Sequence, residues 1–349
     1  MISLGPHLLD PPVFLAPMAG ITDVPFRRLV ARFGAGLVVS EMVASGEMVT
    51  TRPSARAEAR ARADLGGETG VPVAVQLAGR EAAPMAAAAA LVADMGAAAI
   101  DINMGCPARK VTGGASGAAL MRDPDHALRL IEAVVGAAAP RGVPVTLKMR
   151  LGWDDDSRNA PLIAARAVAA GVAMITVHGR TRMQFYGGQA DWAAIAPVVA
   201  AVPVPVVANG DIRCGASARA ARAQSGAAAV MVGRGACGAP WRLAQIAHAQ
   251  GHAPAPVLPR GAELVDLIGE HYEDMLSHYG TKVGARVARK HLGWYAETLG
   301  GTALARRAEL LRADDPAATR ALIASAFAEA AVAPSDAASQ APDAGRVAA

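Results

Sequence analysis

The chain has 349 residues, 53% of them hydrophobic and 18% charged, with a formal net charge of +4 at pH 7. This length accommodates one large barrel with a small added domain, or two medium-sized domains, and it excludes a disulfide-stapled miniprotein. The three cysteines have no CxxC spacing, so they fit a reducing compartment and predict no metal site. The longest apolar run, residues 193–208, contains three prolines and predicts no transmembrane helix. The N-terminus lacks a basic segment before its apolar residues, so we expect a cytoplasmic protein.

Eight short segments rich in β-branched residues recur about every 31 residues, with alanine-rich helical stretches between them. This alternation predicts an α/β fold with a parallel sheet, and eight repeats predict a (β/α)8 TIM barrel. The predicted strands are residues 13–16, 37–40, 73–77, 99–103, 145–148, 174–178, 204–208 and 228–232.

The strand pattern stops after Trp241, and a proline-rich stretch at 252–260 is typical of a linker. Beyond it the sequence predicts only helices: 261–279, 282–298 and a pair that ends near residue 331. We therefore expect a barrel domain at 1–250, a small all-α domain at 251–332, and a disordered tail at 333–349.

Functional groups of such barrels lie at the carboxyl ends of the strands. In this chain polar, cationic and glycine residues follow the predicted strands and should line one pocket. They are Pro17, Met18 and Ala19; Glu41; Gln76; Asn103 and Cys106; Lys148 and Arg150; His178 and Arg180; Asn209, Gly210 and Asp211; and Gly233 and Arg234.

The glycines after the last two strands favour a phosphate site, because backbone without a Cβ can approach an anion closely. Arg234 could add a charged hydrogen bond. Residues 233–238 spell GxGxxG, but no acidic residue follows about 20 positions later. A mononucleotide site is therefore favoured over a dinucleotide-binding Rossmann fold.

Lys148 ends a strand in a chain with only four lysines among its 34 basic residues. It is either a solvated cation or a group that stabilises a reduced flavin ring, whose pyrimidine edge Gln76 could bind. Cys106 lies on a tight loop between a glycine and a proline, and a protonated thiol there suits a proton donor. His178 is either a helper in this chemistry or a structural hydrogen-bonding group.

A basic stripe lies on the second predicted C-terminal helix, where Lys282, Arg286, Arg289 and Lys290 share one face. It is either a solvated face or a surface that contacts nucleic-acid phosphates. Further positive charge at the barrel mouth comes from Arg109, Lys110 and Arg150.

Eight motifs follow one another along residues 16–295: APMAGITD (16–23), VQLAG (75–79), DINMGCPARKV (101–111), LKMRLGWDD (147–155), ITVHGRTR (175–182), ANGDI (208–212), MVGRGA (231–236) and ARKHLGWY (288–295). In this order the motifs resemble those of the bacterial tRNA-dihydrouridine synthases, and KHLGWY resembles the B-type branch. One departure is Leu151, where many members have a hydroxyl residue.

The resemblance implies an FMN-dependent enzyme that reduces a uridine in tRNA to 5,6-dihydrouridine with NADPH, or NADH, as reductant. It implies that Cys106 is the proton donor, with no metal and no membrane involved, and we expect a monomer. The residues that would hold FMN are Pro17, Met18, Ala19, Gln76, Lys148, His178, Asn209, Gly210, Asp211, Gly233 and Arg234. Those expected to contact the uridine or the RNA are Asn103, Arg109, Lys110, Arg150, Arg180, Lys282, Arg286, Arg289 and Lys290.

Two other functions fit parts of the pattern. One is an FMN barrel that acts on a free pyrimidine, such as a dihydroorotate-type dehydrogenase, although a free base would not require the basic helical domain. The other is a noncatalytic RNA-binding barrel, which the complete set of strand-end groups disfavours.

Overall fold

The computed structural model describes residues 1–67 and 69–333. The predicted disordered tail therefore lies, except for residue 333, outside the described residues. None of the described helices combines the length and the apolar character that crossing a membrane requires.

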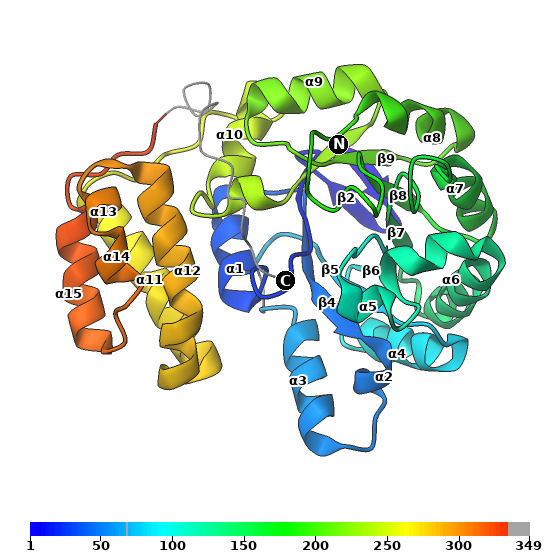
Figure 1. Cartoon of the computed structure of the whole chain (residues 1–349), viewed down its shortest axis with the longest axis horizontal. Coiled ribbons are helices and arrows are strands. Elements are labelled where there is room, and N and C mark those ends of the chain that lie inside the picture. Colours follow the sequence, from blue (N-terminus) through cyan, green and yellow to red (C-terminus); the bar gives the residue numbers. More distant parts are fainter. Residues whose placement is uncertain (68, 334–349) are drawn as a thin grey trace.

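Eight parallel strands form a closed barrel in the order β10-β3-β4-β5-β6-β7-β8-β9, which confirms the predicted TIM barrel (Figure 1). The barrel closes where β10 pairs with β3. All eight predicted segments are strands. Their bounds are β3 Val13–Leu15, β4 Leu37–Ala44, β5 Val73–Ala78, β6 Ala99–Met104, β7 Val145–Arg150, β8 Met174–His178, β9 Val206–Asn209 and β10 Ala229–Val232.

Helices surround the barrel, and their apolar faces pack against the outward-facing side chains of the strands. Local capping fixes where two of them start: the Asp23 and Asp123 carboxylates accept backbone N–H groups at the first turns of α1 and α6. The helices are α1 Val24–Phe33, α2 Ser45–Met48, α3 Pro53–Ala63, α4 Ala82–Asp94, α5 Arg109–Thr112, α6 Pro124–Ala138, α7 Ala160–Ala169, α8 Ala196–Ala201, α9 Gly215–Ser225 and α10 Arg242–Ala249.

An antiparallel hairpin precedes the barrel, and the sequence analysis did not predict it. Its strands are β1 Ile2–Leu4 and β2 His7–Leu9, joined by a turn in which Gly5 has a φ of 55°. Ile2, Leu4 and Leu9 pack in one cluster with the inward-facing side chains of the barrel, such as Phe14 and Met231. The hairpin therefore closes the amino end of the barrel and leaves the carboxyl end open for a site.

The C-terminal part consists of helices, as predicted, and packs against the barrel beside α1 and α10 (Figure 1). Its core includes Leu29 of α1 and Trp241, so the two parts share one apolar cluster. The predicted final pair of helices is in fact three, because the backbone leaves the helical conformation at Arg306 and divides the first of the pair into α13 and α14. The bounds are α11 Ala262–Tyr279, α12 Thr281–Leu299, α13 Gly301–Ala305, α14 Arg307–Leu310 and α15 Pro316–Phe327.

Candidate active site

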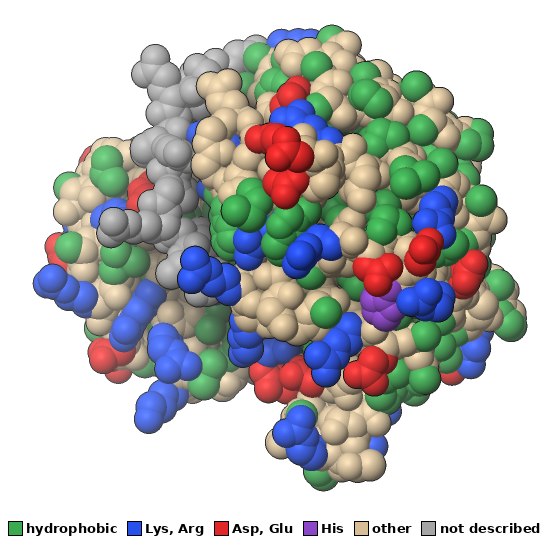
Figure 2. All heavy atoms as spheres, turned by 45° about the vertical axis from the view of Figure 1, so that its right-hand side comes forward, with side chains coloured by type: hydrophobic (Ala, Val, Ile, Leu, Met, Phe, Trp, Pro, Cys, Tyr) green, Lys and Arg blue, Asp and Glu red, His purple; other side chains and the backbone are tan. Residues whose placement is uncertain are grey.

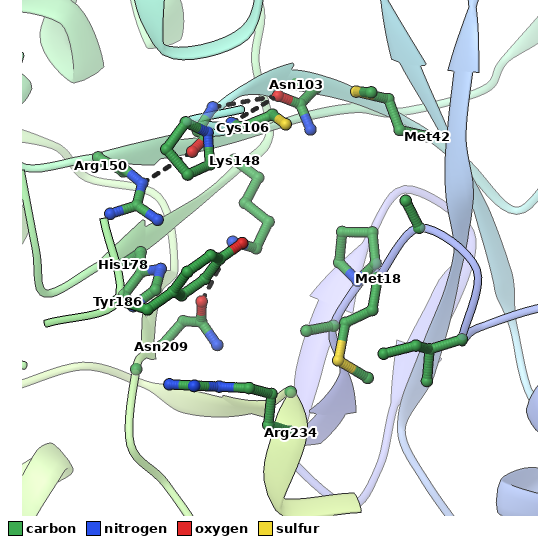
Figure 3. Close-up of a pocket in the computed structure, with 18 of the residues that line it drawn as sticks. Met18, Met42, Asn103, Cys106, Lys148, Arg150, His178, Tyr186, Asn209 and Arg234 are labelled. Atoms are coloured by element: carbon green, nitrogen blue, oxygen red, sulfur yellow. Dashed lines mark hydrogen bonds between the residues drawn. The ribbon is translucent and has the colours of Figure 1, made fainter. Parts of the chain in front are cut away.

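A cavity of about 500 Å³ opens at the carboxyl ends of the barrel strands (Figure 3). Its lining includes every residue that the sequence analysis assigned to catalysis or to the cofactor, from Pro17 after β3 to Arg234 after β10. These residues lie at the carboxyl ends of seven of the eight barrel strands, all except β4, or in the loops that follow them, so the barrel brings together groups that are far apart in the sequence. A cavity of this volume is within the range of small-molecule and cofactor sites.

Cys106 lies at one end of the cavity, on a loop that is fixed by hydrogen bonds on both sides (Figure 3). Asn103 Oδ1 accepts the backbone N–H groups of Gly105 at 3.2 Å and Cys106 at 3.0 Å. The Cys106 carbonyl accepts the Ala118 N–H at 3.1 Å. From β7, Arg150 Nε donates to the Gly105 carbonyl at 2.8 Å. These contacts hold the backbone that carries the thiol.

Arg150 and Arg180 are buried, with about 1% of each residue exposed. Besides Gly105, the Arg150 guanidinium donates to the carbonyls of Thr181 and Phe185, each at 2.8 Å. Arg180 forms an ion pair with Asp211 at 2.6 Å and donates to the carbonyls of two glycines. This burial favours a role in fixing the loops around the cavity over the expected contact with RNA.

A chain of buried hydrogen bonds links β5, β6 and β7 beneath the cavity. Gln76 Nε2 donates to Asp101 at 2.7 Å, Asn103 donates to Gln76 Oε1 at 2.7 Å, and Thr146 donates to Asp101 at 2.6 Å. Gln76 keeps one N–H and one lone pair for a ligand. Burial raises the pKa of Asp101, and the electrostatic interaction with Lys148 opposes this effect.

Lys148 points into the cavity from β7 and donates to Asn209 Oδ1 at 3.1 Å (Figure 3). Burial, together with the nearby Arg150 charge, lowers its pKa to about 8. The ammonium is therefore charged at neutral pH although it is buried. An anionic ligand would offset the free-energy cost of this desolvation.

His178, at the end of β8, is surrounded by cations. Burial, reinforced by Arg150, Lys148 and neighbouring arginines, lowers its pKa well below the usual range, so the ring is neutral at pH 7. The neighbouring Gly210 has a φ of 110°, and a Cβ there would lie 2.8 Å from the His178 ring. Gly210 is therefore needed both for its backbone conformation and for the close approach of β9 to His178.

The loops after β9 and β10 pack on each other at the other end of the cavity. A Cβ on Gly235 would lie 2.6 Å from the Ile212 carbonyl, so the close packing requires glycine. Arg234 Nη2 lies 3.8 Å from the Asp211 carboxylate, and a quarter of the Arg234 side chain is exposed. Glycine backbone beside an arginine is suited to a phosphate group.

Tyr186 is a lining residue that the sequence analysis missed. Its ring lies between Arg150 and Arg234, with guanidinium carbons 5.7 Å and 5.1 Å from the ring centre, and 48% of the residue is exposed. It follows the end of β8 by eight positions, so no strand end marks its place in the sequence. Met42 was missed for a related reason, since β4 runs beyond the predicted residue 40.

The remaining residues expected to contact RNA fall into two groups. The first is exposed: Arg109 and Lys110 on α5, and Lys282 and Arg286 on α12. The second makes internal contacts: Arg289 Nε donates to the Ala313 carbonyl at 3.1 Å, and Lys290 donates to the Gly20 carbonyl. Figure 2 shows Lys and Arg side chains gathered on the lower part of the helical region and on the adjoining face of the barrel.

A family model described as dihydrouridine synthase (Dus) matches residues 14–331. The chain belongs to the dihydrouridine synthase family. The resemblance seen in the sequence, and with it the prediction of an enzyme of this family, is confirmed.

The relatives of this dihydrouridine synthase include curated proteins that match over nearly the whole chain. It is 70% identical to the probable tRNA-dihydrouridine synthase of Rhodobacter capsulatus, over 94% of this chain and 98% of the relative. It is 48% identical to tRNA-dihydrouridine synthase B of Xanthomonas axonopodis pv. citri, over 85% of this chain and 87% of the relative. A solved complex of 2-naphthoyl-CoA reductase aligns with a TM-score of 0.56 at 13% identity, over 71% of this chain and 51% of that chain, which shows a shared fold alone.

Proposed function

We propose that this dihydrouridine synthase binds FMN and reduces uridine in tRNA to 5,6-dihydrouridine, with NADPH, or NADH, as the source of electrons. Family membership supports the reaction, as do the names of the relatives. The observation that carries the proposal is that all side chains assigned to FMN and to proton transfer line one cavity. The enzyme would act as a monomer in the cytoplasm.

The lining chemistry fits FMN in three respects. Glycine backbone and Arg234 at one end suit the phosphate. Lys148, a buried ammonium, suits the edge of a ring that gains negative charge on reduction. Met18 and Met42 offer apolar surface against which a flat ring can pack. The residues that would hold FMN are Pro17, Met18, Ala19, Gln76, Lys148, His178, Asn209, Gly210, Asp211, Gly233 and Arg234.

When bound, FMN supplies the hydride that adds to C6 of the uracil ring. Cys106 Sγ donates a proton to C5, so that the C5=C6 double bond becomes a single bond. Asn103 and Arg150 act as positioning residues, because their hydrogen bonds fix the backbone on either side of the thiol. The target base must leave the RNA stack to reach a cavity this deep in the barrel.

The tRNA backbone would be bound by the exposed cations Arg109 and Lys110, near the cavity mouth, and Lys282 and Arg286 on α12. Positive charge on both the barrel and the helical part suits one extended anion that contacts both.

Reconstitution tests the proposal directly. The purified protein, FMN, NADPH and an unmodified tRNA transcript are incubated together, and dihydrouridine is measured by mass spectrometry of the digested RNA. We expect dihydrouridine in the tRNA and none when free uracil or orotate replaces it. Reduction of the free base with no change in the tRNA would instead establish the free-pyrimidine alternative.

A further inference from the structure

The basic stripe on α12 is divided between two environments. Lys282 and Arg286, in its first half, are exposed. Lys290, four residues after Arg286, is partly buried, and its ammonium donates a hydrogen bond to the Gly20 carbonyl. Gly20 belongs to the segment between β3 and α1, residues 16–23, which we name the Gly20 loop. Pro17, Met18 and Ala19 of this loop line the cavity, whereas Gly20 itself does not.

The Gly20 loop is also held by two buried carboxylates. The Gly20 N–H donates to the Glu41 carboxylate, which comes from β4. Tyr279, at the end of α11, donates its hydroxyl to Asp23 Oδ2 at 2.9 Å, while Asp23 Oδ1 caps α1. Asp23 is 2% exposed and Glu41 9% exposed. Two residues of the helical part, Tyr279 and Lys290, therefore contact the loop directly.

The ammonium of Lys290 brings positive charge to the buried carboxylates of Asp23 and Glu41. Burial raises the pKa of Asp23 and of Glu41, because a desolvated carboxylate is unfavourable in its charged form. Burial lowers the pKa of Lys290, and the charges of these two carboxylates oppose that effect. Two further cations compensate the acids: Arg27, which is 2% exposed and donates to the Thr22 carbonyl at 2.6 Å, and Arg62, whose charge lowers the pKa of Glu41. Removing one cation would leave buried negative charge undercompensated.

The same helix, α12, also contacts the loop that follows β10, which lies beside the Gly20 loop at the cavity. A Cβ on Gly238 would overlap the Trp294 carbonyl and would lie 2.8 Å from Thr298 Oγ1. Gly238 lies two residues after the turn Arg234–Ala236, whose arginine lines the cavity. The helix α12 thus packs behind both loops that flank this side of the cavity, although none of its residues lines it.

We propose that Lys290 is a positioning residue for the cofactor: from the helical part it fixes the Gly20 loop, and it thereby increases the affinity of the cavity for FMN. The inference rests on the proposed function, because it takes FMN as the ligand. It differs from the expectation drawn from the sequence, in which Lys290 contacts RNA. The helical part then has two roles, since α12 presents Lys282 and Arg286 outward and supports the cofactor loop with Lys290.

The test is a titration of FMN into the full-length apoprotein, followed by the change in flavin fluorescence, for Lys290→Met and for Lys282→Met. The Met side chain keeps the apolar stem of lysine and removes the ammonium. Lys290→Met should weaken FMN binding about 10-fold, the effect of losing one charged hydrogen bond. Lys282→Met, the matched control on the same helix, should leave FMN binding unchanged and weaken tRNA binding. Lys290→Arg should restore most of the FMN affinity, because it keeps a donor and a charge.

The proposal would be overturned if Lys290→Met bound FMN within about twofold of wild type and bound tRNA as weakly as Lys282→Met does. Lys290 would then be an RNA contact. An equal loss of FMN affinity in Lys290→Arg would also contradict it. If Lys290→Met does not fold, Tyr279→Phe removes only the donor to Asp23 and should weaken FMN binding several-fold; unchanged binding there overturns the proposal. A wild-type protein that binds FMN but forms no dihydrouridine would refute the proposed function alone, and one that binds no FMN would refute both.

Discussion

Cys106 is the residue whose replacement separates chemistry from binding. The Asn103 and Arg150 side chains hold its loop through the backbone, so removing the thiol leaves the loop in place. Cys106→Ala should lower the rate of dihydrouridine formation by about 100-fold or more, the usual contribution of general acid catalysis. FMN content should not change. The measurement is single-turnover reduction of tRNA by the prereduced enzyme.

The control for this variant is Cys214→Ala. Cys214 is buried at the start of α9 and does not line the cavity. Its replacement should leave the single-turnover rate within about twofold of wild type. If Cys106→Ala reacted as fast as this control, another group would have to donate the proton.

The lining of the cavity was predictable at the level of single residues because the barrel rule assigns function to strand ends. The rule predicts which residues lie at the carboxyl ends of the strands, but it does not predict the direction in which each side chain points. Arg150 and Arg180 were expected to contact the substrate or RNA because they are cations at a strand end; both donate to backbone carbonyls, and Arg150 also lines the cavity. Lys290 was expected to contact RNA because it shares a helix face with three other cations, and its ammonium instead donates to the Gly20 carbonyl. Which acceptor lies nearest to a cation depends on packing between distant segments, which charge patterns do not reveal.

The elements of the barrel were predicted well because a βα repeat is strongly periodic, whereas the hairpin β1–β2 was not. Each of its strands has three residues, too few to show an alternating pattern. The extension of β4 was also missed, because its register shifts between Val39 and Met42. That shift brings Met42 to the cavity, so an irregularity invisible in the sequence affects the site.

The N-terminal hairpin should contribute to stability and not to the site. Leu9 is fully buried against the barrel interior, whereas its neighbour Leu8 is 55% exposed. Leu9→Ala should lower the free energy of unfolding by about 2–4 kcal/mol, and Leu8→Ala by less than about 0.5 kcal/mol. Urea unfolding of the apoprotein measures both. Equal effects of the two substitutions would mean that the hairpin does not close the barrel in solution.

The contact between α1, α11 and α12 should depend on pH through two buried histidines. Burial lowers the pKa of His271 to about 3, and burial with the neighbouring His271 and Lys290 charges lowers that of His291 well below its usual range. Unfolded histidine titrates near 6.5. At a pH between the folded and unfolded pKa values, the histidines bind protons in the unfolded state but not in the folded state. The folded protein is therefore progressively destabilised as the pH falls from about 6.5 towards 3.

The variant His291→Leu isolates this effect, because neither ring nitrogen of His291 has a hydrogen-bond partner among the described residues. The stability of the variant should fall less steeply on acidification than that of wild type, by up to about 1.4 kcal/mol per pH unit. Urea unfolding at pH 7, 6 and 5 gives the slopes. A His291→Leu slope equal to that of wild type would show that His291 does not stay neutral in the folded protein.

At the scale of the whole molecule, tRNA should contact the barrel and the helical part together. Replacing Lys282 and Arg286 with alanine removes two exposed charges. The slope of log K against log salt should then become less steep by about 2, because fewer counterions are released on binding. FMN affinity should not change. Filter binding of tRNA at several salt concentrations measures this slope.

The matched control removes Arg129 and Arg166, which lie on α6 and α7 on the side of the barrel away from the helical part (Figure 1). This double variant has the same net charge as the first. Its salt dependence should equal that of wild type, since the expected RNA surface lies elsewhere. If both double variants reduced the slope of log K against log salt equally, total charge, and not the α12 surface, would govern tRNA binding.

The central claim is that this dihydrouridine synthase modifies tRNA, and mapping dihydrouridine in cellular tRNA tests it most directly. The tRNA of a strain without the gene is compared with that of the parent and of strains complemented with wild type or Cys106→Ala. The account predicts loss of dihydrouridine at a defined position of the D-loop, restored by the wild-type gene and not by Cys106→Ala. An unchanged map in a strain with no second synthase would contradict the account.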